Sequence, residues 1–151
     1  MLTQKVRSGR EKTCMLIKIF LDTNILIYCF DKHDPVKQQK CRSLLKAINQ
    51  DYNGVISTQI IQEFYIAGIK KLKADPFIVK GIIRSFENFE IVAIDLQVIY
   101  KAIDCSILNK ISFWDALVVV SAENANCGEL WTEDLNHGQI INNVKIINPF
   151  K

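Results

Sequence analysis

Cysteine is scarce in this sequence, and the few cysteines are widely spaced. There are five of them, an odd number, and no two form the CxxC pair that is typical of zinc sites and thiol redox sites. They are Cys14, Cys29, Cys41, Cys105 and Cys127. The pattern suggests neither a disulfide framework nor a zinc site, so we expect the protein to work in the reducing cytoplasm.

Long hydrophobic runs are absent as well. A helix that crosses a bilayer needs about 18 consecutive apolar residues, but Lys18 and Asp22 interrupt the first candidate and Glu123 ends the apolar run 116–122. The same interruptions argue against a signal peptide. With 151 residues, 49% of them hydrophobic, we expect one domain with one core and no membrane segment.

An excess of charge of one sign is missing outside the first residues. The net charge is +3, and the basic residues of 1–14 account for all of it. We expect 1–14 to be a poorly ordered extension and 15–151 to be the folded domain. Because that domain has as many acidic as basic residues, any binding of nucleic acid must use local patches. The candidate patches are Lys70, Lys71 and Lys73, and Lys37, Lys40, Arg42 and Lys46.

Motifs of several common enzyme classes are also missing. The sequence has no Walker A and no GxGxxG motif, which argues against enzymes that use nucleotide cofactors. A haloacid-dehalogenase-like phosphatase needs a second aspartate two residues after Asp22, where this chain has Asn24. The acidic pair of a phosphoacceptor receiver domain is not apparent either.

What the sequence does have is an alternation of strands and helices. Short apolar runs predict strands, and apolar residues at three- and four-residue spacing predict helices. The predicted strands are 17–21, 54–57, 90–94, 129–132 and 144–147, and the predicted helices are 23–30, 36–49, 58–72, 113–125 and those that begin after Asp75 and Asp95, with a short helical turn at 137–140. We therefore predict an α/β fold whose central, mostly parallel five-stranded sheet has helices on both faces.

Four carboxylates occupy positions that look costly for folding alone. Asp22 and Asp134 follow predicted strands, whereas Glu63 and Asp115 lie on predicted helices. The carboxyl ends of parallel strands share one edge of a sheet, where open α/β folds place their sites. Clustered carboxylates repel one another unless a cation lies between them. The cation that such oxygen ligands favour is Mg²⁺ or Mn²⁺.

Each carboxylate also has an ordinary structural interpretation. Asp22 can be a helix N-cap, Asp115 the N3 residue of a capping box that begins at Ser112, and Asp134 a turn residue. Glu63 can be a solvated helix position. Taken together these interpretations are weaker, because the neighbours of Asp22 and Asp115 are largely apolar and an unpaired charge among apolar side chains costs several kcal/mol.

Four stretches stand out together, and they are FLDTNILIY at 20–28, QEF at 62–64, SFWDAL at 112–117, and LWTEDLNHGQ at 130–139 with NPF at 148–150. They resemble the PIN-domain ribonucleases, and most of all the VapC-type toxins of prokaryotic toxin and antitoxin pairs. The first stretch alone is a weak signal, but the four in this order are specific. The resemblance covers nearly all of 15–151.

The resemblance implies roles for individual residues. Asp22, Glu63 and Asp115 match the first three acidic residues of the family, and Asp134 matches the more variable fourth, a role for which Glu133 could compete. Thr23, Asn24 and Thr132 would orient the carboxylates. These three supporting residues are expected to hold the geometry of a metal site.

The resemblance also implies an activity and partners. They are Mg²⁺- or Mn²⁺-dependent cleavage of RNA that leaves 5′-phosphate and 3′-hydroxyl ends, a homodimer, and inhibition by a cognate antitoxin protein. Whether one or two metal ions act remains open, and the sequence does not determine which RNA is cut. His137 is a candidate acid or base, although a structural turn is the favoured role because metal can supply the hydroxide. The alternative is a PIN-like module that binds RNA or a protein without cutting.

Overall fold

A single mixed sheet forms the centre of the molecule. The computed structural model describes residues 17–151, and the six strands within them are ordered β3-β2-β1-β4-β6-β5 across the sheet. The strands are β1 Lys18–Leu21, β2 Asn53–Ser57, β3 Glu90–Val92, β4 Glu129–Trp131, β5 Ile140–Ile141 and β6 Val144–Ile147. All neighbouring pairs are parallel except β5 and β6, which are antiparallel.

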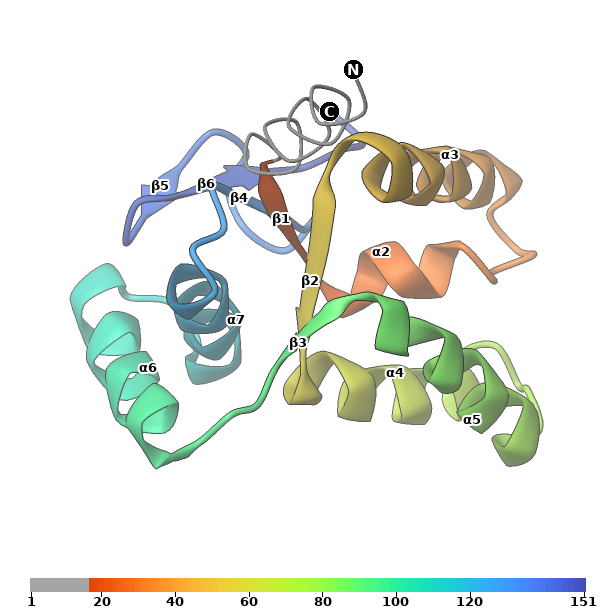
Figure 1. The fold of residues 1–151 in the computed structure, drawn as a ribbon, viewed down its shortest axis with the longest axis horizontal. Coiled ribbons are helices and arrows are strands. Elements are labelled where there is room, and N and C mark those ends of the chain that lie inside the picture. Colours follow the sequence, from red (N-terminus) through yellow and green to blue (C-terminus); the bar gives the residue numbers. More distant parts are fainter. Residues whose placement is uncertain (1–16) are drawn as a thin grey trace, which may run out of the picture.

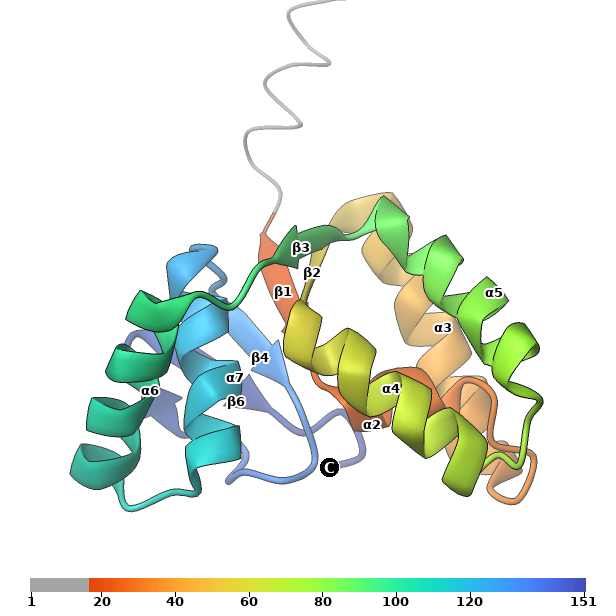
Figure 2. The ribbon, with the colours of Figure 1, turned by 90° about the horizontal axis from the view of Figure 1, so that it is seen from below.

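Helices cover both faces of this sheet. They are α2 Thr23–Tyr28, α3 Pro35–Asp51, α4 Thr58–Lys70, α5 Pro76–Ser85 with the 3₁₀ turn η1 Phe86–Asn88, α6 Leu96–Asn109 and α7 Phe113–Asn124. Figures 1 and 2 show α2 to α5 on one side of β1 and β2, and α6 and α7 on the other. The predicted fold class, a single α/β domain with a mostly parallel sheet between two helical layers, is confirmed.

The number of strands was predicted as five and is six. The additional strand is β5, which follows a turn at His137 and Gly138 where a short helical turn was predicted. Asn142 and Asn143, which join β5 to β6, both have positive φ angles of 49° and 64°. Two consecutive residues of this kind form the tight turn that matches the twist of a hairpin, so the chain folds back onto β6.

The helices begin where side chains can accept hydrogen bonds from free backbone N–H groups. Ser57, Asp75, Asp95 and Ser112 each accept one from the first turn of the helix that follows. Pro76 occupies the first turn of α5, where a missing N–H costs nothing. Because such caps fix where a helix starts, they also fix where Glu63 and Asp115 lie on α4 and α7.

The carboxyl ends of β1 and β4 lie beside each other and define the edge where the predicted site should form. Leu21 pairs with Trp131, so Asp22 and Thr132 are the first residues after two adjacent strands. The backbone N–H of Asp22 donates to the carbonyl of Trp131 at 3.1 Å. The end of β2 leads at Ser57 directly into α4, which brings Glu63 to the same region.

The core is built from aliphatic side chains of the strands and from aromatic side chains between α2, α4 and α5. Phe64 is fully buried and packs edge-to-face against Phe86, with ring centroids 4.9 Å apart, and against Phe30 at 6.0 Å. None of the helices in residues 17–151 is both long and apolar enough to cross a membrane. The predicted extension 1–14, with Cys14, lies outside the described residues.

Candidate active site

Asp22 is a buried carboxylate at the junction of β1 and α2. Only 7% of the residue is exposed. Its Oδ1 accepts a hydrogen bond from the backbone N–H of Thr23 at 2.8 Å, and its Oδ2 accepts one from the hydroxyl of Thr132 at 2.7 Å. Burial nevertheless raises the pKa of Asp22 to about 6, against the lowering effect of these two bonds, and Asp134 and Glu63 raise it further. The ionised form therefore needs a positive charge that the neighbouring side chains do not supply.

Thr132 connects two of the candidate carboxylates. Its hydroxyl donates to Asp22 and also accepts a hydrogen bond from the backbone N–H of Asp134 at 3.1 Å. Thr132 itself is 1% exposed. Because this buried hydroxyl donates one hydrogen bond and accepts another, it fixes the turn after β4 relative to Asp22.

Glu63 is oriented from two sides. Its Oε2 accepts a hydrogen bond from the hydroxyl of Thr23 at 2.6 Å, and its Oε1 accepts one from Nε2 of Gln59 at 2.8 Å. Nε2 of Gln59 also donates to the carbonyl of Trp114 at 3.3 Å, which connects α4 to the first turn of α7. The side chain of Glu63 is thus held toward the edge formed by β1 and β4.

Asp134 and Asp115 complete the acidic edge. Oδ2 of Asp134 accepts a hydrogen bond from Nδ2 of Asn24 at 3.1 Å. Burial raises the pKa of Asp134, Asp115 and Glu133 raise it further, and Lys71 lowers it. Asp115 is half-buried at the third position of α7, where its backbone N–H donates to Ser112 at 3.1 Å. Its carboxylate accepts no hydrogen bond within residues 17–151, so it is available to another ligand.

Glu133 has other partners than the acidic edge. Its Oε2 accepts from Nζ of Lys37 at 3.0 Å, and its Oε1 accepts from the hydroxyl of Tyr28 at 2.5 Å. Nζ of Lys37 also lies 4.5 Å from the ring centroid of Tyr28 and 4.8 Å from that of Phe150. The two sequence candidates for the fourth carboxylate are therefore in different surroundings, and only Asp134 faces the others.

Neither histidine forms a hydrogen bond with the four carboxylates in residues 17–151. Nδ1 of His137 accepts a hydrogen bond from the backbone N–H of Asn148 at 2.9 Å. This contact holds the segment after β6 against the turn after β4. His33 is exposed in the loop between α2 and α3. The contact of His137 supports its structural role.

The oxygen ligands at this edge suit a hydrated Mg²⁺ or Mn²⁺ ion better than an ion that is enclosed by protein ligands alone. In the part of the chain that the structure describes, no three His, Cys, Asp or Glu side chains converge closely enough to hold an ion by themselves. Mg²⁺ typically keeps several waters and binds directly to one or two carboxylates. Two buried oxygens beside the carboxylates, Oδ1 of Asn24 and Oε1 of Gln59, accept no hydrogen bond from residues 17–151. They are suitable acceptors for the waters of such an ion.

Sequence reasoning missed three of these partners. Gln59 supports Glu63 and could have been found from its position one helical turn earlier on α4. Lys37, with Tyr28, removes Glu133 from the site, and no sequence signal connects residues that are 96 positions apart.

A parallel α/β sheet with acidic side chains gathered at its carboxyl edge is a common architecture for sites that bind cations and phosphates. The chain belongs to the PIN domain family, whose model matches residues 19–141. This confirms the family to which the sequence motifs pointed. A comparison with curated proteins finds no match.

Solved structures show the same fold at low sequence identity. A toxin-antitoxin complex from Klebsiella pneumoniae is 20% identical with a TM-score of 0.65, covering 87% of this chain and 97% of that one. VapC20 of Mycobacterium tuberculosis, described as a sarcin-ricin loop cleaving toxin, is 13% identical with a TM-score of 0.65 over 77% and 91%. VapBC-1 from nontypeable Haemophilus influenzae is 16% identical with a TM-score of 0.65 over 89% and 100%.

Proposed function

We propose that the protein is a metal-dependent endoribonuclease whose Mg²⁺ or Mn²⁺ is held by Asp22, Glu63, Asp115 and Asp134. The observation that carries this proposal is the buried carboxylate of Asp22, held by Thr23 and Thr132 at an edge that Glu63 and Asp134 also approach. A carboxylate buried beside other carboxylates is costly for folding, and a bound cation offsets that cost. Membership of the PIN domain family supports the same chemistry.

The protein's own residues would position the reacting groups. Asp22 and Glu63 are pre-oriented by Thr23 and Thr132, so little reorganisation is needed when an ion binds. Asp134 is held by Asn24 and is close enough to Asp22 to raise its pKa. Asp115, whose carboxylate accepts no hydrogen bond in residues 17–151, raises the pKa of Asp134 in turn. When bound, the metal supplies an activated water and stabilises charge on the phosphodiester as it is hydrolysed. No serine, cysteine or histidine nucleophile is required.

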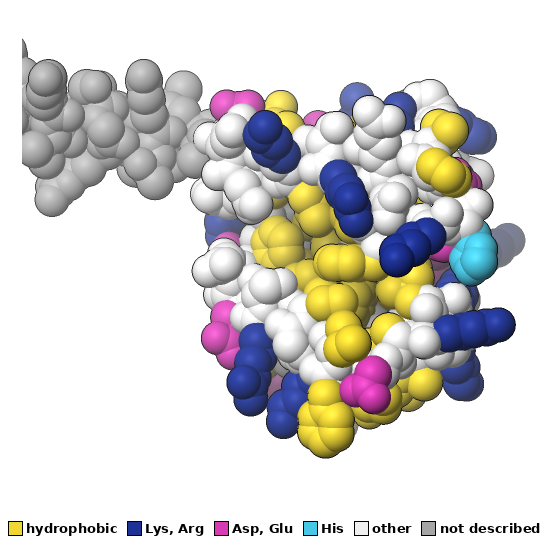
Figure 3. Space-filling model, turned by 90° about the vertical axis from the view of Figure 1, so that its right-hand side faces the viewer, with side chains coloured by type: hydrophobic (Ala, Val, Ile, Leu, Met, Phe, Trp, Pro, Cys, Tyr) yellow, Lys and Arg dark blue, Asp and Glu magenta, His cyan; other side chains and the backbone are white. Residues whose placement is uncertain are grey.

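The solved structures with this fold support a toxin role. One is described as a toxin-antitoxin complex, one as a toxin that cleaves the sarcin-ricin loop, and two as VapBC proteins bound to DNA. Figure 3 shows hydrophobic side chains gathered in a hollow with Lys and Arg side chains around it. One pocket of about 330 Å³ is lined by Phe30, Leu72, Ala74, Ile78 and Ile82 together with 31–33 of the α2–α3 loop. An antitoxin segment with apolar and acidic side chains suits this combination of surfaces.

A homodimer is supported by a row of exposed apolar residues on α6. Leu96, Tyr100, Ile103 and Ile107 are 57%, 52%, 41% and 69% exposed. Their spacing of four, three and four residues puts them on one face of the helix, as in helices that pack against each other. A second copy of the chain that presents the same face would cover this row symmetrically.

The four cysteines of residues 17–151 are free and buried. Free thiols are typical of proteins in the reducing cytoplasm, where we expect this protein to act.

A module that binds RNA or a protein without cutting is the second candidate. The two candidates differ in what happens to the RNA.

The test is to incubate purified protein with a pool of small RNAs in Mn²⁺, in Mg²⁺ and in EDTA, and to map the ends of the products. We expect discrete cuts with either ion and none with EDTA, leaving 5′-phosphate and 3′-hydroxyl ends. RNA that is bound but stays intact in both ions would favour the non-cutting module.

A further inference from the structure

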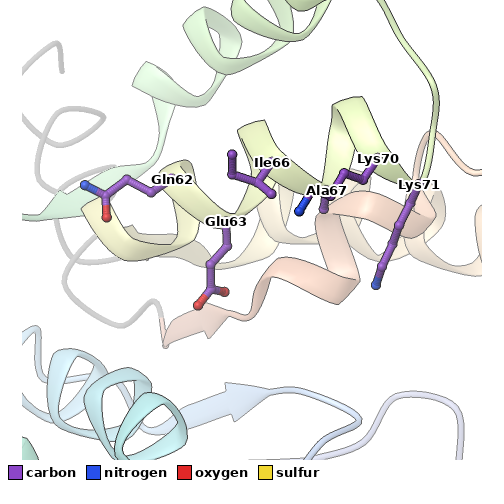
Figure 4. A pocket seen from close by; sticks show the side chains of 6 residues that line it. All are labelled: Gln62, Glu63, Ile66, Ala67, Lys70 and Lys71. Atoms are coloured by element: carbon purple, nitrogen blue, oxygen red, sulfur yellow. The ribbon is translucent and has the colours of Figure 1, made fainter.

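A shallow groove runs along α4 away from Glu63. It has a volume of about 390 Å³ and is lined by Gln62, Glu63, Ile66, Ala67, Lys70 and Lys71. Figure 4 shows the carboxylate of Glu63 toward one end and the two lysines toward the other, with the side chains of Glu63 and Lys71 pointing to the same side of the helix. This size is at the lower end of the range for small-molecule sites.

Along the groove, an acidic end is followed by an apolar middle and a basic end. Ile66 and Ala67 lie three and four residues after Glu63, and Lys70 lies four and three residues after them, so the four residues share a face of α4. Ile66 is 50% exposed and offers an apolar side chain between the carboxylate and the lysines. From Glu63 to Lys70 the helix rises by about 10 Å.

The two lysines are cations that form no salt bridge in residues 17–151. Among the salt bridges of residues 17–151, which join Lys18 to Glu90 and Lys37 to Glu133, neither Lys70 nor Lys71 takes part. Both are exposed. Lys71 lies close enough to the acidic edge to lower the pKa of Asp134. The positive end of the groove is therefore part of the same electrostatic environment as the carboxylates.

We infer that this groove is a subsite for the RNA strand beside the scissile phosphate, in which Lys70 and Lys71 hold a neighbouring phosphate and Ile66 packs against a base. The inference rests on the proposed function and deepens it. Single-stranded nucleic acid combines anionic phosphates with flat apolar bases, and proteins bind it through cationic side chains and apolar contacts in alternation. Since the folded body has no overall positive charge, such a local pair of lysines is needed to hold the strand.

The test measures binding separately from cleavage. We use the Asp115→Asn variant of the full chain with a short single-stranded RNA of mixed sequence, and measure fluorescence anisotropy over a range of salt concentrations. Lys70→Gln with Lys71→Gln should weaken binding and reduce the slope of log K against log salt by about 0.7 for each phosphate that is no longer neutralised. Lys73→Gln is the matched control, since Lys73 is exposed, lies two residues further along and does not line the groove.

The outcomes separate this inference from the proposed nuclease. A loss of RNA affinity and salt slope in the double variant, with the Lys73 control unchanged, supports the subsite whether or not the wild-type protein cuts RNA. Equal RNA affinity and equal slope in the double variant would overturn it, even if the wild-type protein cuts RNA in Mn²⁺. A double variant that loses only binding of an acidic partner protein would overturn it as well.

Discussion

Among single residues, Asp22 shows the conflict between folding and function most clearly. It is a helix cap with two hydrogen bonds, and yet burial raises its pKa to about 6 from 3.8. In the metal-free protein, the folded state thus binds this proton more tightly than the unfolded state does. The contribution of Asp22 to stability therefore falls as the pH rises from about 4 to about 6 and stays low above that window.

The variant Asp22→Asn has no ionisable group at this position, so it should not lose stability between pH 4 and pH 6 in this way. At pH 7.5 in EDTA we expect the variant to be more stable than the wild type by roughly 1–3 kcal/mol, since a shift of one pKa unit corresponds to about 1.4 kcal/mol. The difference should shrink as the pH falls through about 4, because well below the unfolded pKa of 3.8 the wild-type carboxyl is protonated in both states. Thermal unfolding at several pH values measures it. A variant that is less stable at pH 7.5 than the wild type, or a difference that does not vary with pH, would contradict this account of Asp22.

The candidate carboxylates and three supporting residues were visible in the sequence, but the pairing between them was not. Asp22, Asp134 and Thr132 stand out because they follow short apolar runs whose ends meet at one sheet edge. Asn24 hydrogen-bonds to Asp134 and Thr23 to Glu63, across 110 and 40 residues of sequence. Such pairs are set by how the strands and helices are packed, which periodicity alone does not determine.

Among helices and strands, close packing of β2 depends on one glycine. A Cβ atom at Gly54 would lie 2.6 Å from Cδ1 of Phe89 and 3.0 Å from Cγ2 of Ile48. A Cβ at Gly81, which is exposed in the middle of α5, would meet nothing within 4 Å. The two positions differ in packing, and glycine is favourable only at the first.

The pair Gly54→Ala and Gly81→Ala should therefore change stability in opposite directions. Gly54→Ala should destabilise the protein by about 1–3 kcal/mol because it overpacks the site. Gly81→Ala should stabilise it by about 0.5–1 kcal/mol because alanine is the better helix former. Urea unfolding of both variants tests this. Unchanged stability in Gly54→Ala would show that Phe89 can move away at no cost.

Most of the elements follow from local sequence, whereas the sixth strand does not. The run 17–21 and the helix 58–72 were predicted within two residues of β1 and α4, because the first is a short apolar run and the second has a helical apolar period. β5 contains only Ile140 and Ile141, too few residues for any period to be seen. Its pairing depends on the left-handed backbone of Asn142 and Asn143, a turn that many sequences with adjacent asparagines do not form.

For the molecule as a whole, the exposed row on α6 predicts an association. Ile107→Glu places a charge within the apolar row formed by Leu96, Tyr100, Ile103 and Ile107. We expect this variant to be monomeric where the wild type is a dimer, because burying an unpaired charge is costly. Gln97→Glu, at another exposed position on α6, adds the same charge as a control and should stay dimeric. Light scattering measures the mass of both, and a dimeric Ile107→Glu would contradict this choice of interface.

The central claim is that the acidic edge formed by β1, α4, α7 and the turn after β4 binds the metal that cuts RNA. Glu133 provides a matched control, because it is a carboxylate next to Asp134 that pairs with Lys37 and Tyr28 instead of facing the site. The most direct measurement compares initial rates of RNA cleavage in Mn²⁺ for the wild type, Asp115→Asn and Glu133→Gln. We expect Asp115→Asn to be slower by about 10²-fold or more, because it loses metal stabilisation of several kcal/mol, and Glu133→Gln to stay within about tenfold of the wild type. If Asp115→Asn cut RNA at the wild-type rate, or if Glu133→Gln lost as much activity as Asp115→Asn, the claim would be wrong.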